Sequence, residues 1–270
     1  MRAAYTGWTW LVNHQDNHKW EFEQSLKEAA DLGYVAVENF AFIRDYFDND
    51  ADAVAQLLKK YNLEMANFYL HLSDDEEKDK QNAREGIAFM KKIGATFMNL
   101  QAIMWHDEPN ERPTDEAVVK DYARRSEEIG KMCTEAGIKA CFHPHANTHI
   151  FTEKEIDLLM ANSTPGNLYL CLDTAHTMVA GMDVVSAFER FADRLAYVHF
   201  KDVDPDQNLA PMKRFRALGD GVVDFKGVYN VLKKNGYDGV ICVELDNPAV
   251  CNYKSAMVSA RYLHDVLGLI

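Results

Sequence analysis

The sequence predicts an α/β protein with a single (β/α)8 barrel, also called a TIM barrel, that forms one domain over residues 1–270. Three observations lead to this prediction. Short apolar segments alternate with amphipathic segments along the whole chain, glycines stand where helices should give way to strands, and the length of 270 residues suits one barrel of about 250 residues. No linker, strong repeat or change in composition divides the chain.

The apolar segments are short and rich in β-branched and other apolar residues, as expected for parallel strands that are buried on both faces. We expect eight strands, at Ala3–Thr6, Tyr34–Phe40, Leu63–Leu70, Thr96–Gln101, Ile138–His143, Leu168–Asp173, Leu195–His199 and Val240–Glu244.

The segments between the predicted strands have helical periodicity, most clearly at Trp20–Leu32, Asp115–Ala136 and Tyr253–Leu267. Left-handed helix caps are expected at the glycines that follow such segments, namely Gly33, Gly94, Gly137 and Gly236. The longest irregular stretch is Asp202–Asp224, and a loop of that length in a compact domain is usually functional.

Composition restricts the functional classes. Hydrophobic residues make up 47% and charged residues 26%, which is typical of a globular protein. The net charge of −13 opposes binding to nucleic acid. The five cysteines are odd in number and form no CxxC pair, and we see neither a signal peptide nor a membrane span, so we expect a cytoplasmic protein with reduced thiols. A homo-oligomer or a complex with a second subunit is compatible with the sequence.

Four consecutive predicted strands end in residues that can bind a metal. These residues are His143 (followed by His145), Asp173, His199 and Glu244. Active sites of TIM barrels lie at the C-terminal ends of the strands, so these side chains should meet at one rim. One such residue would usually be an ordinary hydrogen-bonded side chain, but four would each need a separate buried partner. We therefore predict one divalent metal ion, and nitrogen with carboxylate ligands suits Mn²⁺, Co²⁺, Fe²⁺, Zn²⁺ or Mg²⁺.

The segments LCLDTAHTMVAG, AYVHFKDVDP, LGDGVVDF and VICVELDNP resemble the xylose isomerase-like TIM barrels, the sugar phosphate isomerase/epimerase family. The resemblance covers essentially the whole chain and implies one divalent metal, which we expect to be Mn²⁺. It also implies that Asp173, His199 and Glu244 are ligands, that His176 contacts a substrate hydroxyl, and that Arg216 contacts the substrate near the metal.

One departure from the family pattern bears on the reaction. Members that isomerise or epimerise sugars typically have a glutamate at the end of the fifth strand, where this chain has His143 in HPHANTH. The HPHxxT pattern resembles instead the inosose dehydratase branch and related lyases that act on 3-keto sugars and keto-glycosides. We assign His143 to the metal and His145 to proton transfer, with the two roles exchangeable, and Glu244 to catalysis as well as to the metal.

These residue types suit elimination next to a ketone. A divalent cation stabilises negative charge on a carbonyl oxygen, and an imidazole can take a neighbouring proton near neutral pH. The predicted function is therefore a metal-dependent lyase or dehydratase of a keto-sugar, keto-cyclitol or keto-glycoside. The main alternative is a sugar isomerase or epimerase on the same metal site. An apurinic endonuclease, which the net charge opposes, and a non-catalytic sugar-binding subunit are further alternatives.

Three other residues have two interpretations each. Glu38 ends the second predicted strand and should contact a substrate hydroxyl, unless it forms a salt bridge at the rim. Trp10 should stack on a sugar face, unless it packs the mouth of the barrel. Asp202 either orients the imidazole of His199 or simply begins the long loop.

Overall fold

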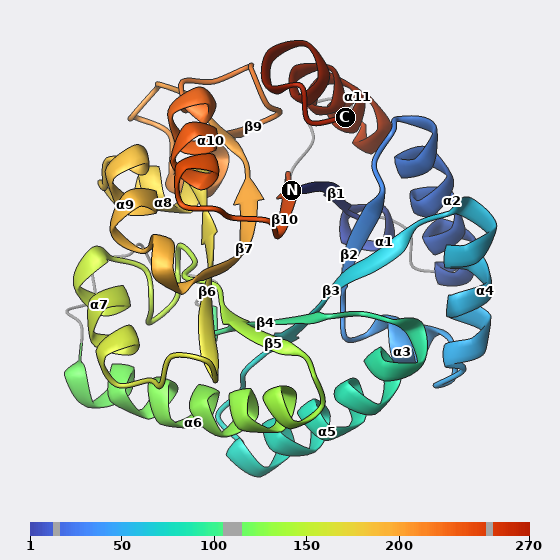
Figure 1. Cartoon of the computed structure of the whole chain (residues 1–270), viewed down its shortest axis with the longest axis horizontal. Coiled ribbons are helices and arrows are strands. Elements are labelled where there is room, and N and C mark those ends of the chain that lie inside the picture. The colour runs from blue at the N-terminus through green and yellow to red at the C-terminus, as the bar shows by residue number, and fades with distance from the viewer. Residues whose placement is uncertain (13–16, 105–114, 247–250) are drawn as a thin grey trace.

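In the computed structural model, which describes residues 1–12, 17–104, 115–246 and 251–270, eight parallel strands form a closed barrel (Figure 1). Around the barrel they follow the order of the sequence, and the last strand pairs with the first. The strands are β1 (Arg2–Thr6), β2 (Ala36–Phe40), β3 (Glu64–His71), β4 (Phe97–Gln101), β5 (Lys139–Phe142), β6 (Leu168–Asp173), β7 (Leu195–Phe200) and β10 (Val240–Val243). Each overlaps one of the predicted strands, and the predicted (β/α)8 barrel is confirmed.

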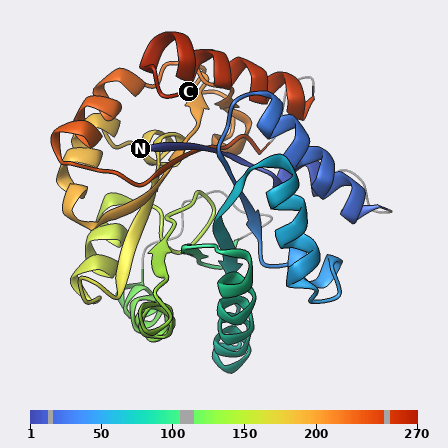
Figure 2. The same cartoon turned by 45° about the vertical axis from the view of Figure 1, so that its right-hand side comes forward.

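Helices surround the barrel in both views (Figures 1 and 2). They are α1 (Trp8–Val12), α2 (His18–Asp31), α3 (Ile43–Tyr46), α4 (Ala51–Tyr61), α5 (Glu76–Ile93), α6 (Glu116–Glu135), α7 (Glu153–Ala161), α8 (Thr174–Val179), α9 (Val184–Arg190), α10 (Phe225–Lys234) and α11 (Asn252–Tyr262). The predicted helix at Tyr253–Leu267 is divided, because α11 ends at Tyr262 and a π-helical turn follows over Leu263–Leu267. All four predicted glycine caps have positive φ, at 88° for Gly33, 76° for Gly94, 75° for Gly137 and 68° for Gly236.

The core has two parts. A large cluster of apolar side chains fills the space between the strands and the helices, for example Phe22, Leu26 and Val37. A smaller cluster fills the inside of the barrel with mostly small side chains and thiols: Ala4, Ala36, Ala66, Phe97, Cys141, Cys171, Ala196, Tyr197, Val240 and Cys242. The thiols are free, as predicted, and burial raises the pKa of Cys171 to about 11, which keeps it protonated at neutral pH.

The long loop after β7 contains a small antiparallel hairpin that the sequence did not predict, formed by β8 (Asp202–Val203) and β9 (Phe215–Arg216). The Asp202 carboxylate holds the returning chain, because it accepts hydrogen bonds from four backbone N–H groups, those of Val203, Gly219, Gly221 and Val223. A Cβ at Gly221 would lie 2.4 Å from Asp202 Oδ1, so only glycine fits there. The interpretation that Asp202 orients His199 is therefore wrong, and its carboxylate organises the loop.

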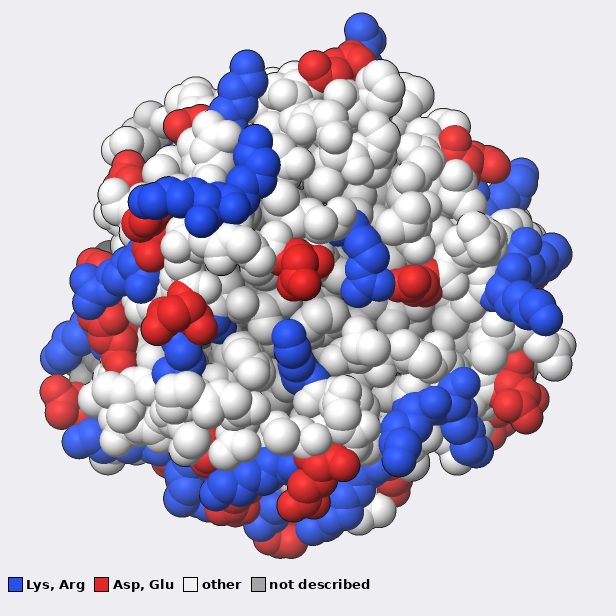
Figure 3. Space-filling view, in the orientation of Figure 1, with Lys and Arg blue, Asp and Glu red and all other residues white. Residues whose placement is uncertain are grey.

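Acidic and basic side chains are interspersed on the face of the molecule shown in Figure 3, which presents no continuous basic surface. None of the helices that the structure describes is long and apolar enough to cross a membrane.

Candidate metal centre and active site

The four predicted metal ligands meet at the C-terminal end of the barrel. His143 follows β5, Asp173 ends β6, His199 lies in β7 and Glu244 follows β10. One ligand atom from each lies within 4.8 Å of the other three, and all four residues are buried. His199 Nδ1 is 3.1 Å from Glu244 Oε2 and 3.9 Å from Asp173 Oδ2. Closure of the barrel therefore brings together residues from four strands.

In each residue of this cluster, one atom that could bind a metal makes no hydrogen bond, although the two carboxylate oxygens among these atoms lie in ion pairs with Lys201. His143 Nδ1–H donates to the carbonyl of Cys171 at 3.2 Å, and His199 Nε2–H donates to Glu38 at 3.0 Å. Within the described chain, four buried atoms of the cluster then lack a hydrogen bond: His143 Nε2, Asp173 Oδ2, His199 Nδ1 and Glu244 Oε2. Buried polar atoms normally have partners. Two imidazole nitrogens and two carboxylate oxygens fit a divalent cation in number and chemical type.

Asp173 uses its two carboxylate oxygens differently. Oδ1 caps the N-terminus of α8 by accepting from the backbone N–H groups of Ala175 at 2.6 Å and His176 at 2.9 Å. Oδ2 is the oxygen that faces the other ligands. Burial raises the pKa of Asp173 to about 6, an effect that Lys201 partly offsets.

Glu38 lies beside His199 with an exposed fraction of 1%. Its Oε2 accepts from His199 Nε2–H at 3.0 Å and from Asn67 Nδ2 at 2.9 Å. This contact places the proton of His199 on Nε2 and leaves Nδ1 for a metal. The expected contact of Glu38 with a substrate hydroxyl has no support in this placement, because its carboxylate is bonded to the imidazole of His199 and to Asn67.

Lys201, to which the sequence assigned no role, is fully buried next to the four predicted ligands. Its Nζ is 2.8 Å from Glu244 Oε2, 2.8 Å from Asp246 Oδ2 and 3.4 Å from Asp173 Oδ2. Burial alone would lower the pKa of Lys201, but the three carboxylates raise it well above its ordinary value, so Lys201 carries a proton in the metal-free protein. The sequence contains one indication of this position: Lys201 stands two residues after His199 in extended chain at the end of β7, and side chains with that spacing point to the same face.

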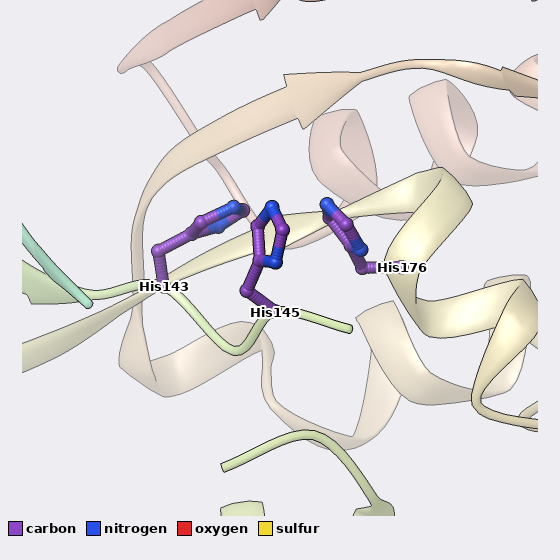
Figure 4. Close-up of side chains that lie close together, drawn as sticks. All are labelled: His143, His145 and His176. Atoms are coloured by element: carbon purple, nitrogen blue, oxygen red, sulfur yellow. The ribbon is translucent and has the colours of Figure 1, made fainter. Parts of the chain in front are cut away.

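The three histidines His143, His145 and His176 lie side by side, with His145 in the middle (Figure 4). The ring centroids of His145 and His176 are 3.9 Å apart, and those of His143 and His145 are 5.5 Å apart. His145 Nδ1–H donates to the carbonyl of Ala146 at 2.6 Å, which leaves Nε2 as the basic nitrogen. Burial, helped by the charge of Lys201, lowers the pKa of His145 to about 3, so this imidazole is neutral at physiological pH.

The HPHxxT pattern has a structural explanation. The backbone N–H of His145 donates to the carbonyl of Ile150 at 3.0 Å, and Thr148 Oγ1 accepts from the backbone N–H of Ile150 at 3.2 Å. Within this turn, between His145 and Thr148, Asn147 adopts a left-handed conformation with φ of 62°. The threonine therefore closes a turn that holds His145 beside the cluster.

Two residues that were predicted to contact the substrate, Arg216 and Trp10, make hydrogen bonds to other groups of the protein. Arg216 Nη2 donates to Asp204 Oδ2 at 2.7 Å, and its other contacts are to backbone carbonyls of the hairpin. Trp10 Nε1 donates to Glu28 Oε2 at 2.6 Å, and its ring packs against Tyr5. The polar groups of both residues are thus engaged within the protein. A substrate contact by Arg216 or Trp10 stays a prediction, as does a second, catalytic role for Glu244.

Comparison with known proteins agrees with this geometry. The family described as xylose isomerase-like TIM barrel matches residues 26–263. The inosose dehydratase of Geobacillus kaustophilus is 29% identical over an alignment of 269 positions, gaps included, and the alignment covers 89% of this chain and 86% of that protein.

Two solved structures of the same fold are similar at low sequence identity. The IolI protein with a bound zinc atom has a TM-score of 0.79 at 16% identity, with 99% of this chain and 98% of that chain covered. D-psicose 3-epimerase from Clostridium cellulolyticum has a TM-score of 0.78 at 14% identity, with 100% and 99% covered. By its sequence match and its closed barrel, this chain belongs to the xylose isomerase-like TIM barrel family.

Proposed function

We propose that this chain is a metal-dependent lyase that removes a proton next to a ketone and eliminates a β-substituent as water or an alcohol. The proposed substrate class is a keto-cyclitol, keto-sugar or keto-glycoside, and the dehydratases among the relatives support it because an inosose is a keto-cyclitol. The observation that carries the proposal is the convergence of four buried atoms without hydrogen bonds beside a neutral imidazole, that of His145.

The residues that would hold the ion are His143 through Nε2, His199 through Nδ1, and Asp173 and Glu244 through one oxygen each. When bound, a divalent cation supplies a Lewis acid that draws electron density from a carbonyl oxygen and so makes the neighbouring C–H group more acidic. We propose Mn²⁺, with Zn²⁺ as the first alternative because the similar IolI protein carries zinc.

His145 is the proposed base. Its Nε2 takes the proton from the carbon next to the ketone, and the electrons of that C–H bond form the new carbon–carbon double bond as the β-carbon–oxygen bond breaks. The departing oxygen takes a proton from the His145 imidazolium, so the products are an enone and water or an alcohol.

The direct test is a product assay in deuterated water with the metal-loaded enzyme. The substrates are an inosose, a simple ketose and a 3-keto-glycoside, and the products are followed by mass spectrometry and by the ultraviolet absorbance of an enone. We expect loss of water or of an aglycone from at least one substrate. His145→Asn is the matched variant, because asparagine can keep a donor to the carbonyl of Ala146 while it lacks the basic nitrogen.

The assay also separates the main alternative. If the enzyme incorporates deuterium and interconverts aldose with ketose, or two epimers, while eliminating nothing, the lyase proposal is wrong. The isomerase or epimerase would then be the function.

A further inference from the structure

Gln101 is a buried hydrogen-bond donor that the proposed reaction does not yet use. It ends β4, and its exposed fraction is 2%. Its Oε1 accepts a hydrogen bond of 2.5 Å from the hydroxyl of Tyr69, which fixes the orientation of the amide. Its Nε2, which carries two hydrogens, has no hydrogen-bond partner in the described structure. A buried amide donor without a partner is costly, so a ligand is the natural source of an acceptor.

The amide lies on the inner face of the barrel, near the metal centre. Along β4, Asn99 has the same orientation as Gln101, and the Asn99 side chain reaches Cys171 in the interior. The ring of Tyr69, which holds the amide, has its centroid 5.7 Å from that of His143 and 6.5 Å from that of His199. In a closed barrel of eight strands, the fourth strand lies opposite the eighth, so Gln101 faces the side of the mouth that carries Glu244.

The cationic side chains around this mouth are already paired with carboxylates of the protein. Lys201 is paired with Asp246 and with the two carboxylates of the metal cluster, and Arg216 is paired with Asp204. A divalent cation would balance Asp173 and Glu244. Among these described residues, no cationic side chain is without a carboxylate partner, so none is available to pair with a phosphate or carboxylate of a substrate. An unpaired substrate anion in so buried a site would be costly.

We infer that Gln101 Nε2 donates to an uncharged oxygen of the substrate, a hydroxyl or ether oxygen, and that the site takes neutral polyhydroxy ketones rather than phosphorylated or carboxylated ones. This inference rests on the proposed function and narrows its substrate class. Gln101 is a specificity-determining residue, and Tyr69 is the positioning residue that aims it.

Binding is tested first, with probes that cannot react. Calorimetry on the metal-loaded protein compares myo-inositol with myo-inositol 1-phosphate. We expect the neutral polyol to bind at least about tenfold more tightly. Gln101→Arg adds an uncompensated cation and should shift the preference toward the phosphate ester. Tighter binding of the phosphate ester by the unmodified protein would overturn the neutral-substrate inference.

Kinetics with the substrate found in the product assay test the hydrogen bond itself. Gln101→Glu keeps the acceptor for Tyr69 but removes both donors, and Gln101→Met removes acceptor and donors at similar size. Each should raise KM by about tenfold with a smaller change in kcat and no change in bound metal. Tyr69→Phe, which only frees the amide, should have a smaller effect. An unchanged KM in both Gln101 variants would refute the role of Gln101. Absence of elimination by the unmodified enzyme would instead refute the proposed function, and the binding comparison between myo-inositol and its phosphate ester would still be valid.

Discussion

Glu38→Ala tests whether a carboxylate outside the metal cluster sets the affinity of the metal site. Glu38 accepts from Nε2–H of His199 at 3.0 Å, and this bond keeps Nδ1 of the same ring free for the ion. Both side chains are essentially inaccessible to solvent. Residues that orient a metal-binding histidine typically contribute 10–100-fold to metal affinity, which corresponds to about 1.4–2.7 kcal/mol.

The assay is a metal titration at neutral pH in competition with a fluorescent chelator. We expect the Kd of Glu38→Ala to rise by about 10–100-fold, and that of Glu38→Gln to rise less because the amide oxygen can still accept from His199. Glu127→Ala is the matched control, because Glu127 also accepts two hydrogen bonds, from Thr164 N and Asn167 Nδ2, but lies on α6 and holds the segment before β6. An unchanged Kd for Glu38→Ala, or an equal rise for Glu127→Ala, would refute the orienting role.

Four further predictions follow from the geometry. Asp173→Asn should abolish metal binding while the protein stays folded, because the amide oxygen can still cap α8. Asp173→Ala should abolish metal binding and also lower the free energy of unfolding by about 1 kcal/mol, because the cap is lost. Metal analysis and a denaturant titration check both variants. His145→Asn should keep the metal and lower kcat by about 10²–10⁴-fold in the product assay. Burial raises the pKa of Asp173 to about 6, and the neighbouring acidic groups Cys171, Glu38 and Glu244 outweigh burial and raise that of His199 well above its ordinary value. Protons therefore compete with the metal at both residues, so metal affinity should rise with pH through neutrality and fall most steeply below about pH 6 in chelator titrations. Asp202→Ala leaves four backbone N–H groups without their acceptor and should cost about 3 kcal/mol or more, with faster proteolysis in the 202–224 loop.

The barrel and the cluster of metal-competent residues at its mouth could be predicted because the signals are local in the sequence. A strand buried on both faces is a short apolar run wherever it occurs, and a left-handed cap favours glycine, as at Gly94 and Gly137. The fold rule that active sites lie at strand ends then selects Asp173 and Glu244 without any knowledge of side-chain contacts.

The contacts that the sequence did not predict depend on how the barrel closes. Glu38 and His199 are 161 positions apart, and only the arrangement of their strands brings the carboxylate to the imidazole. Gln101 looks like any polar strand end until the partner of its oxygen, Tyr69, is known. Lys201 was visible by its spacing from His199, but its three carboxylate partners come from two other segments of the chain.

Three of the four proposed ligands follow one pattern, in which the protein binds one polar atom of the side chain and leaves the other for the ion. The carbonyl of Cys171 holds His143, Glu38 holds His199, and the N-terminus of α8 holds Asp173. Each hydrogen bond fixes a rotamer and, for the imidazoles, a tautomer before any metal arrives. The entropy lost in ordering these ligands therefore belongs to folding, and metal binding need not supply it. His145 has its own partner in the carbonyl of Ala146 and stands outside the group of four, although it forms a second group of closely spaced ligand-type atoms with His143 and His176. Because only the group of four contains carboxylates, we assign the ion to that group and His143, and the free nitrogen of His145 to the substrate.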